Sequence, residues 1–200
     1  MYKKLLFALI ISLLGGCISL GGDQKNANAI YVLADASALP LNAQPALTHT
    51  LLIEATRGNE FDNHEALVFS RAPHTRGRYK FAHWSELPST RFSELLFNRL
   101  STANVYTTVA NASSDVIPDR RLVTELLAFY HDASTNPGHV HMVVRAELYD
   151  SQHHRLIARR VFEQNTPLAS YDAEGAAAAF NLATQHILTD ISAWLQASDI

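Results

Sequence analysis

The sequence has 200 residues, with 16 lysines and arginines against 19 aspartates and glutamates, so its formal net charge at pH 7 is −3. A chain of this length can bury a core as one domain. Its basic residues are scattered along the sequence, which predicts no nucleic-acid partner.

The first residues are typical of a secretory signal. Lys3 and Lys4 precede an apolar run over 5–14, and small residues lie immediately before Cys17. The run is shorter than the ~20 residues that a helix needs to cross a bilayer. We therefore predict that residues 1–16 are a signal peptide and that the mature chain does not span a membrane.

The segment Leu14-Gly15-Gly16-Cys17 resembles a bacterial lipobox, in which the cysteine is acylated before cleavage. An ordinary secretory signal whose cleavage site happens to contain Cys17 is the alternative. Cys17 is the single cysteine, so an exported chain could form no internal disulfide, and acylation would remove a free thiol. We predict lipidation at Cys17, and several acyl chains would make the attachment effectively permanent.

The residues after the cysteine predict location and a tether. Ile18 is not the aspartate that favours inner-membrane retention in bacterial lipoproteins, so we expect the outer membrane, facing the periplasm. Residues 17–29 are small and polar, too poor in apolar area to fold, and are predicted to be a flexible tether. Residues 30–200 are expected to form a single periplasmic domain.

Short strands are predicted in the first part of this domain. A short apolar group begins it, and a strand and a hairpin follow, with Pro73 and Gly77 between the two arms of the hairpin. The apolar group is Ile30–Leu33, the strand is Leu47–Ala55, and the arms of the hairpin are Ala66–Phe69 and Arg78–Phe81.

The spacing of apolar residues then changes to that of a helix. After Pro88, either Ser89 or Thr90 can cap a helix, and Phe92, Leu95, Leu96 and Leu100 recur along one of its faces. A proline costs nothing at a helix start, where the amide would be unpaired anyway. A strand over 105–109 and a loop over 113–118 follow.

Three strands and a long helix are predicted to complete the chain. The strands span 121–131, 140–149 and 156–162, and the middle one alternates apolar and polar residues. The short polar connection 150–154 indicates an antiparallel hairpin. Residues 173–195 carry an apolar stripe at helical spacing. This order predicts an α+β fold, with one antiparallel or mixed β-sheet and two main α-helices packed on one face.

The order of features resembles the ABC-type transport auxiliary lipoprotein family over nearly all of the mature chain. Its most specific parts are the segment 79–88, with Trp84-Ser85-Glu86-Leu87-Pro88, and the terminal helix ending Ala193-Trp194-Leu195. The sequence departs from the family pattern at Leu87, where a second proline is common, and at 152–154, where glycine is common.

The resemblance implies a docking or tethering subunit beside a lipid-transport system. It implies an MCE-domain protein and its associated transporter as partners, an acyl anchor in outer-membrane lipid, and a homo-oligomer as one form of the assembly. The alternative from the residues is a lipoprotein that acts on its own and holds a lipid or a metal ion in its own cavity.

The residues predict no catalytic site, no metal site and no cofactor. His139 and His141 share one face of a strand, but zinc sites need three or four ligands and no further ligand lies at a partnering spacing. Asp62, Glu65 and Glu86 fall in different elements, and the chain lacks a nucleophile elbow and a phosphate loop.

The partner-binding residues are not specified by the sequence. Trp84 could anchor a partner, or it could close the core where the sheet leads into the first helix, which is the reading we favour. Trp194 belongs to the helical stripe and is expected to be packed. The loop 59–64 and the turn 71–78 are mixed in charge and are expected to be exposed, which makes them candidates for a contact surface.

Overall fold

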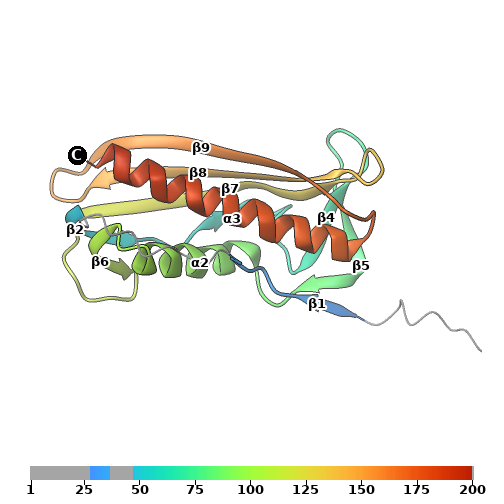
Figure 1. Cartoon of the computed structure of the whole chain (residues 1–200), viewed down its shortest axis with the longest axis horizontal. Coiled ribbons are helices and arrows are strands. Elements are labelled where there is room, and N and C mark those ends of the chain that lie inside the picture. Colours follow the sequence, from blue (N-terminus) through green and yellow to red (C-terminus); the bar gives the residue numbers. More distant parts are fainter. Residues whose placement is uncertain (1–27, 37–46, 200) are drawn as a thin grey trace, which may run out of the picture.

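A computed structural model describes residues 28–36 and 47–199, which form one mixed nine-stranded sheet and two helices (Figure 1). The predicted signal peptide, Cys17 and most of the tether lie outside the described residues. The strands are β1 (Ala29–Tyr31), β2 (Leu47–Ile53), β3 (Arg57–Gly58), β4 (Ala66–Ser70), β5 (Gly77–Trp84), β6 (Tyr106–Asn111), β7 (Arg120–Asp132), β8 (His139–Asp150) and β9 (Arg155–Pro167), and the helices are α2 (Pro88–Thr102) and α3 (Ala173–Ser198).

Strand β7 organises the sheet. Along one edge it pairs in parallel with β2, β3 and β4 in succession, and along its other edge it pairs antiparallel with β8. β8 continues into β9 through a second antiparallel pairing. The remaining strands extend the side opposite β8, because β6 lies parallel to β2, β5 antiparallel to β4, and β1 parallel to β5.

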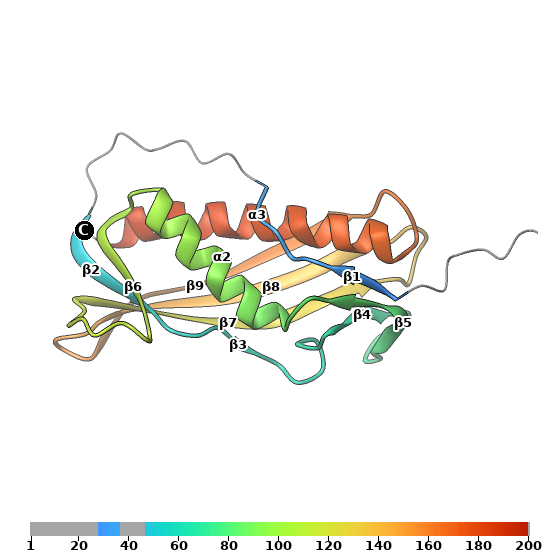
Figure 2. The same ribbon diagram turned by 90° about the horizontal axis from the view of Figure 1, so that it is seen from below.

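Both helices lie on the same face of the sheet (Figure 2). The inward residues of β8, from Val140 to Leu148, are completely buried, as are Phe180 and Ile187 of α3. Phe129 of β7 stacks on Phe180 with ring centroids 4.1 Å apart. This buried layer between α3 and the sheet is the core, and the α+β prediction with two helices on one face is confirmed.

The opposite face of the sheet is polar and cross-linked by ion pairs. Glu147 of β8 accepts hydrogen bonds from Arg159 Nε (2.8 Å) and from the hydroxyl of Tyr149 (2.6 Å). Arg145 bonds to Glu125 of the neighbouring strand. The alternation predicted for the middle strand therefore separates an apolar face from a solvated one, as expected.

The predicted cap of the first helix is wrong. α2 begins at Pro88 with Leu87 as its N-cap, and neither Ser89 nor Thr90 caps it with its side chain. Instead the Ser89 N–H donates to Asn63 Oδ1 at 3.0 Å. Because Pro88 has no N–H, a side chain from a distant loop satisfies the first free amide of the helix.

Candidate functional site

The loop 59–64 and the turn 71–78, predicted as a contact surface, lie against each other next to β7. Arg76, in the turn between β4 and β5, donates from Nε to Asp62 Oδ1 at 2.7 Å. The same guanidinium lies over the ring of Tyr130, 3.7 Å from its centroid. The ion pair joins residues fourteen positions apart, and the cation–π contact fixes the same arginine against β7.

Part of this surface is structural. Asn59 donates from Nδ2 to the carbonyl of Leu127 at 2.7 Å, and Asp62 Oδ2 accepts the N–H of Phe129 at 3.2 Å. These side chains complete the ladder of β7 in the interval between its partners β3 and β4. Asp62 is only 2% exposed, so its carboxylate holds the loop in place and is not offered to a ligand.

A hollow of about 360 Å³ lies between the two segments. Phe61 is 72% exposed at its rim, and His74 and Arg76 contribute polar groups. Aromatic and arginine side chains are enriched in protein interfaces. The hollow can receive an apolar side chain beside an anionic group.

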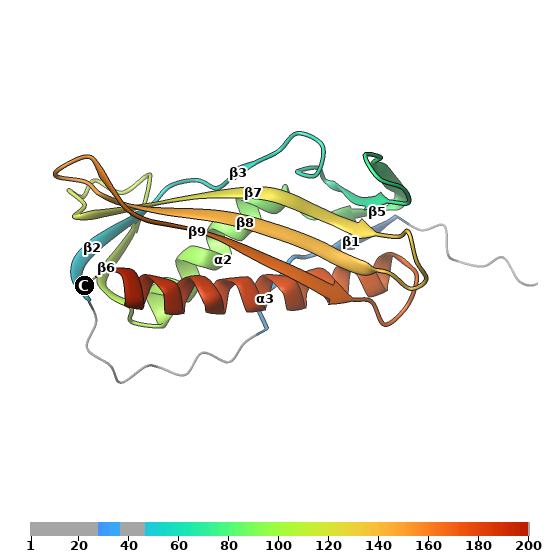
Figure 3. The same cartoon turned by 90° about the horizontal axis from the view of Figure 1, so that it is seen from above.

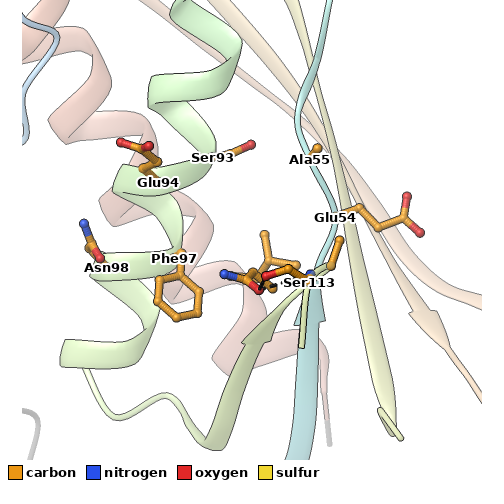
Figure 4. Close-up of a pocket in the computed structure, with 10 residues that line it drawn as sticks. Glu54, Ala55, Ser93, Glu94, Phe97, Asn98 and Ser113 are labelled. Atoms are coloured by element: carbon orange, nitrogen blue, oxygen red, sulfur yellow. Dashed lines mark hydrogen bonds between the residues drawn. The ribbon is translucent and has the colours of Figure 1, made fainter. Parts of the chain in front are cut away.

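A second, apolar groove separates α2 from the ends of β2 and β6. It encloses about 410 Å³ and is lined by Ile53, Phe97 and Ala112 among others. Figure 4 shows Phe97 and Ser113 facing this space, whereas the carboxylate of Glu54 points away from it. The volume falls within the range of small-molecule sites, so the groove can hold an apolar ligand.

Both tryptophans belong to the core. Trp84 is 4% exposed and packs against Phe129 and Phe180, with centroid separations of 5.7 and 5.4 Å. Trp194 meets Phe162 of β9 edge to face at 5.8 Å. The prediction that both tryptophans pack in the core is therefore confirmed.

The histidines do not converge on a metal site within the part of the chain that the structure describes. His141 Nδ1 lies 2.8 Å from Asn165 Oδ1, and His153 Nδ1 lies 3.1 Å from Asp150 Oδ2. The hydrogen bonds that His153 donates, first from its backbone and then from its ring, lower the pKa of Asp150 to about 2.

His131 is the one fully buried histidine among the described residues. Its Nε2–H donates to the carbonyl of Pro137 (3.1 Å), so its Nδ1 accepts from the hydroxyl of Tyr79 (2.8 Å). Burial is the main cause that lowers the pKa of His131, and burial also raises the pKa of Tyr79 to about 12. This neutral pair joins β5 to the β7–β8 turn.

A charged cluster at the end of α3 was missed by the sequence analysis. Asp199, 3% exposed, accepts from Arg120 Nε at 2.6 Å and lies 3.3 Å from His49 Nδ1. Burial, followed by the charge of Asp199, raises the pKa of the nearby Tyr106. The pairing spans 150 positions between His49 and Asp199, so no local pattern could have predicted it.

Neither described helix is long and apolar enough to cross a bilayer. The predicted lipidation site Cys17 lies outside the described residues, and its acylation stays a prediction. Of the predicted carboxylates, Asp62 is buried and paired with Arg76, whereas Glu86 lies 4.0 Å from Arg91 at the start of α2.

Comparison with known proteins identifies the family. The model of the ABC-type transport auxiliary lipoprotein component matches residues 31–192. A Xanthomonas campestris protein of family DUF330 superposes with a TM-score of 0.78 at 20% identity, covering 85% of this chain and 95% of that one.

A hypothetical protein of Chlamydia trachomatis shares the fold at a TM-score of 0.55 and 12% identity, over 76% of this chain and 98% of that one. No curated protein matches the sequence. The family is one of transport auxiliary lipoproteins of the cell envelope and is not an enzyme class. With four-fifths of its length matched, this chain belongs to the ABC-type transport auxiliary lipoprotein family.

Proposed function

We propose that this protein is a membrane-anchored docking subunit of an intermembrane lipid-transport system, bound to an MCE-domain protein and its associated transporter. The family match over residues 31–192 carries the proposal. The hollow between loop 59–64 and turn 71–78 and the apolar groove beside α2 are compatible with a binding role. The MCE partner is the one that the resemblance of the sequence to this family implies.

The proposal includes an acyl anchor. Removal of residues 1–16 takes away two lysines, which changes the formal charge from −3 to −5 and leaves Cys17 at the start of the mature chain. Membership in a lipoprotein family and the lipobox-like segment support acylation there. Ile18 supports an outer-membrane location.

Intact-mass analysis of the membrane-extracted protein tests the anchor. The mature chain should begin at Cys17 and carry diacylglycerol and a further acyl group, and a Cys17→Ser variant should lose its firm membrane attachment. A wild-type protein without fatty acid, or a variant that remains as firmly bound, would overturn this part of the proposal.

Affinity purification from detergent-solubilised envelopes tests the docking role. The tagged, acylated protein should co-purify an MCE-domain protein, which an unrelated lipoprotein with the same tag should not. Native mass spectrometry of the purified assembly then gives the number of copies of this chain. Recovery of folded, acylated protein without any MCE protein would contradict the proposal.

The groove between α2 and the sheet favours a second candidate, a lipid-binding function of the chain itself. An Ala112→Trp variant places a large ring in the groove, because Ala112 is exposed and lines it. Native mass spectrometry should detect lipid on the wild type and none on this variant. An equal lipid content in both would exclude the groove as the lipid site.

A further inference from the structure

The β4–β5 hairpin concentrates positive charge in a chain that is acidic overall. Arg71, Arg76, Arg78 and Lys80 fall within ten residues, and no aspartate or glutamate occurs from residue 66 to residue 85. We call residues 71–80 the basic hairpin. Its cations form a local excess of positive charge that the net charge of −3 conceals.

Three of these cations are free to bind an external anion. Arg76 is paired with Asp62, but Arg71, Arg78 and Lys80 are exposed and form no ion pair with any carboxylate of the described residues. Arg71 lies over Phe69 and Lys80 over Phe81, at 4.8 and 5.0 Å from the ring centroids. These are cation–π contacts of the charged groups themselves, and both residues stay exposed to solvent.

Two carboxylates on neighbouring elements are already engaged. Asp132, next to the hairpin at the end of β7, accepts hydrogen bonds from the N–H and the hydroxyl of Ser134. Asp172, at the start of α3, accepts from the N–H of Gly175 and from Ser170. Each carboxylate accepts hydrogen bonds from a backbone N–H and a serine hydroxyl close to it in the sequence.

The chain enters the fold beside this hairpin. β1 is parallel to β5, with Ala29 opposite Ala82, so the first described residues lie alongside β5, the second strand of the hairpin (Figures 1 and 3). Twelve positions separate Cys17 from Ala29, which at full extension span about 40 Å. A bilayer that holds Cys17 is therefore within reach of this end of the molecule.

We propose that the basic hairpin is a membrane-facing surface that binds the phosphate groups of anionic lipids in the bilayer to which the protein is anchored. The inference rests on the acyl anchor of the proposed function. Lysine and arginine near an anionic bilayer are attracted to its surface over about one Debye length, and the anchor lets the hairpin approach the surface to within that distance. The opposite end, with the β8–β9 turn, then points away from the membrane.

The proposed orientation is testable with the acylated full chain in vesicles. Because acylation occupies Cys17, an added cysteine carries the only free thiol. Ala72→Cys places a fluorescent label in the basic hairpin, and Gln152→Cys places it in the β8–β9 turn; both positions are exposed. Quenching by lipids with a quencher on the headgroup reports which end lies near the bilayer.

In vesicles of phosphatidylethanolamine and phosphatidylglycerol, the label at 72 should be quenched several-fold more than the label at 152. The difference should shrink in phosphatidylcholine vesicles and in about 1 M salt, where the Debye length is about 3 Å. Reversing Arg71, Arg78 and Lys80 to glutamate should abolish it. Reversing Arg57, Arg155 and Arg160, exposed cations that likewise form no ion pair with a carboxylate of the described residues, is a charge change of the same size and should leave the difference intact.

Equal quenching at the two positions, or quenching indifferent to lipid charge, would overturn the orientation. If the triple reversal left quenching unchanged but removed the co-purified MCE protein, the hairpin would instead be a protein-binding surface and the inference would be wrong. The failure of the anchor is recognised separately. Intact mass would then show no fatty acid at Cys17, and the protein would bind no vesicle, which overturns the proposed anchor.

Discussion

A buried ion pair joins α2 to the segment after β1. Arg99 donates from Nε and NH2 to the two carboxylate oxygens of Asp35, at 2.8 and 2.7 Å. The side chains are only 6% and 10% exposed. Burial removes both ions from water, and the attraction between them offsets part of the free-energy cost of that desolvation.

Replacing Asp35 with alanine should lower the free energy of unfolding by about 3–5 kcal/mol, because the guanidinium stays buried without its two-point partner. Glu94→Ala, which removes an exposed partner of Arg91, should cost less than about 1 kcal/mol. Urea denaturation measures both. A cost for Asp35→Ala no larger than that of Glu94→Ala would show that the pair does not hold α2.

His131 predicts a pH-dependent stability. Burial lowers the pKa of this ring below its usual 6.5, so the unfolded chain takes up the proton more readily than the folded one. The free energy of unfolding should therefore fall as the pH drops below about 6.5, until the lowered pKa of the folded state is reached. Unfolding curves in urea at a series of pH values measure this slope.

Variants assign that slope to one ring. His131→Gln, which is neutral throughout, should show a shallower fall between about pH 7 and pH 5, whereas His74→Gln at an exposed position should behave as the wild type. Identical slopes for the wild type and His131→Gln would contradict the assignment.

Single residues were predicted well where burial follows a local pattern and poorly where a distant partner decides. The alternation from Val140 to Leu148 identified the inward face, and the helical stripe placed Trp194 in the core. The pairs Asp35–Arg99 and His49–Asp199 bridge 64 and 150 positions. Spacing along a chain carries no information about contacts of that separation.

At the scale of elements, the two helices begin in different ways. α3 has a side-chain cap, since Asp172 accepts the N–H of Gly175 at 2.8 Å, whereas α2 relies on Pro88 and on Asn63 from a remote loop. The predicted cap at Ser89 or Thr90 failed because a side chain outside the helix had taken that role.

Asp172→Ala should therefore destabilise the protein by about 1 kcal/mol, because an amide of the first turn loses its acceptor. Asp172→Ser should retain most of the stability. Thr90→Ala, at the exposed position once expected to cap α2, should change little. Thermal unfolding compares the three, and an equal loss for Thr90→Ala would restore the original assignment of the cap.

Strand positions could be read from hydrophobic pattern, but strand partners could not. The predicted strands all exist, and β7 to β9 are longer than expected. Two short strands were missed, because Arg57 and Gly58 of β3 offer no periodicity and the residues of β1 were expected only as an apolar group and the end of the tether. That β2, β3 and β4 all lie parallel to β7 depends on packing of the whole sheet.

For the molecule as a whole, β9 leaves a long outer edge without a partner in the described part of the sheet. Val161 is 52% exposed near that edge, between Arg159 and Glu163. Charged residues on an edge strand discourage pairing with another chain. These charges are expected to keep the edge from adding further strands.

An Arg159→Thr/Glu163→Thr double variant should consequently self-associate more strongly than the wild type. Sedimentation velocity over a range of protein concentrations measures the change, and Arg71→Thr/Glu60→Thr, which removes one charge of each sign at two exposed positions, is the control. If both double variants sediment as the wild type does, the edge charges do not protect β9.

The position of β7 in the sheet also has a consequence for the order of folding. β2, β3 and β4 precede β7 in the chain, yet each of them pairs with β7. β7 itself pairs with β8, to which a short turn connects it. Local pairing closes faster than distant pairing. During synthesis or export from the N-terminus, β2, β3 and β4 must therefore wait for β7 before their pairing is complete, and pulse-labelled amides of β8 should gain protection before those of β2.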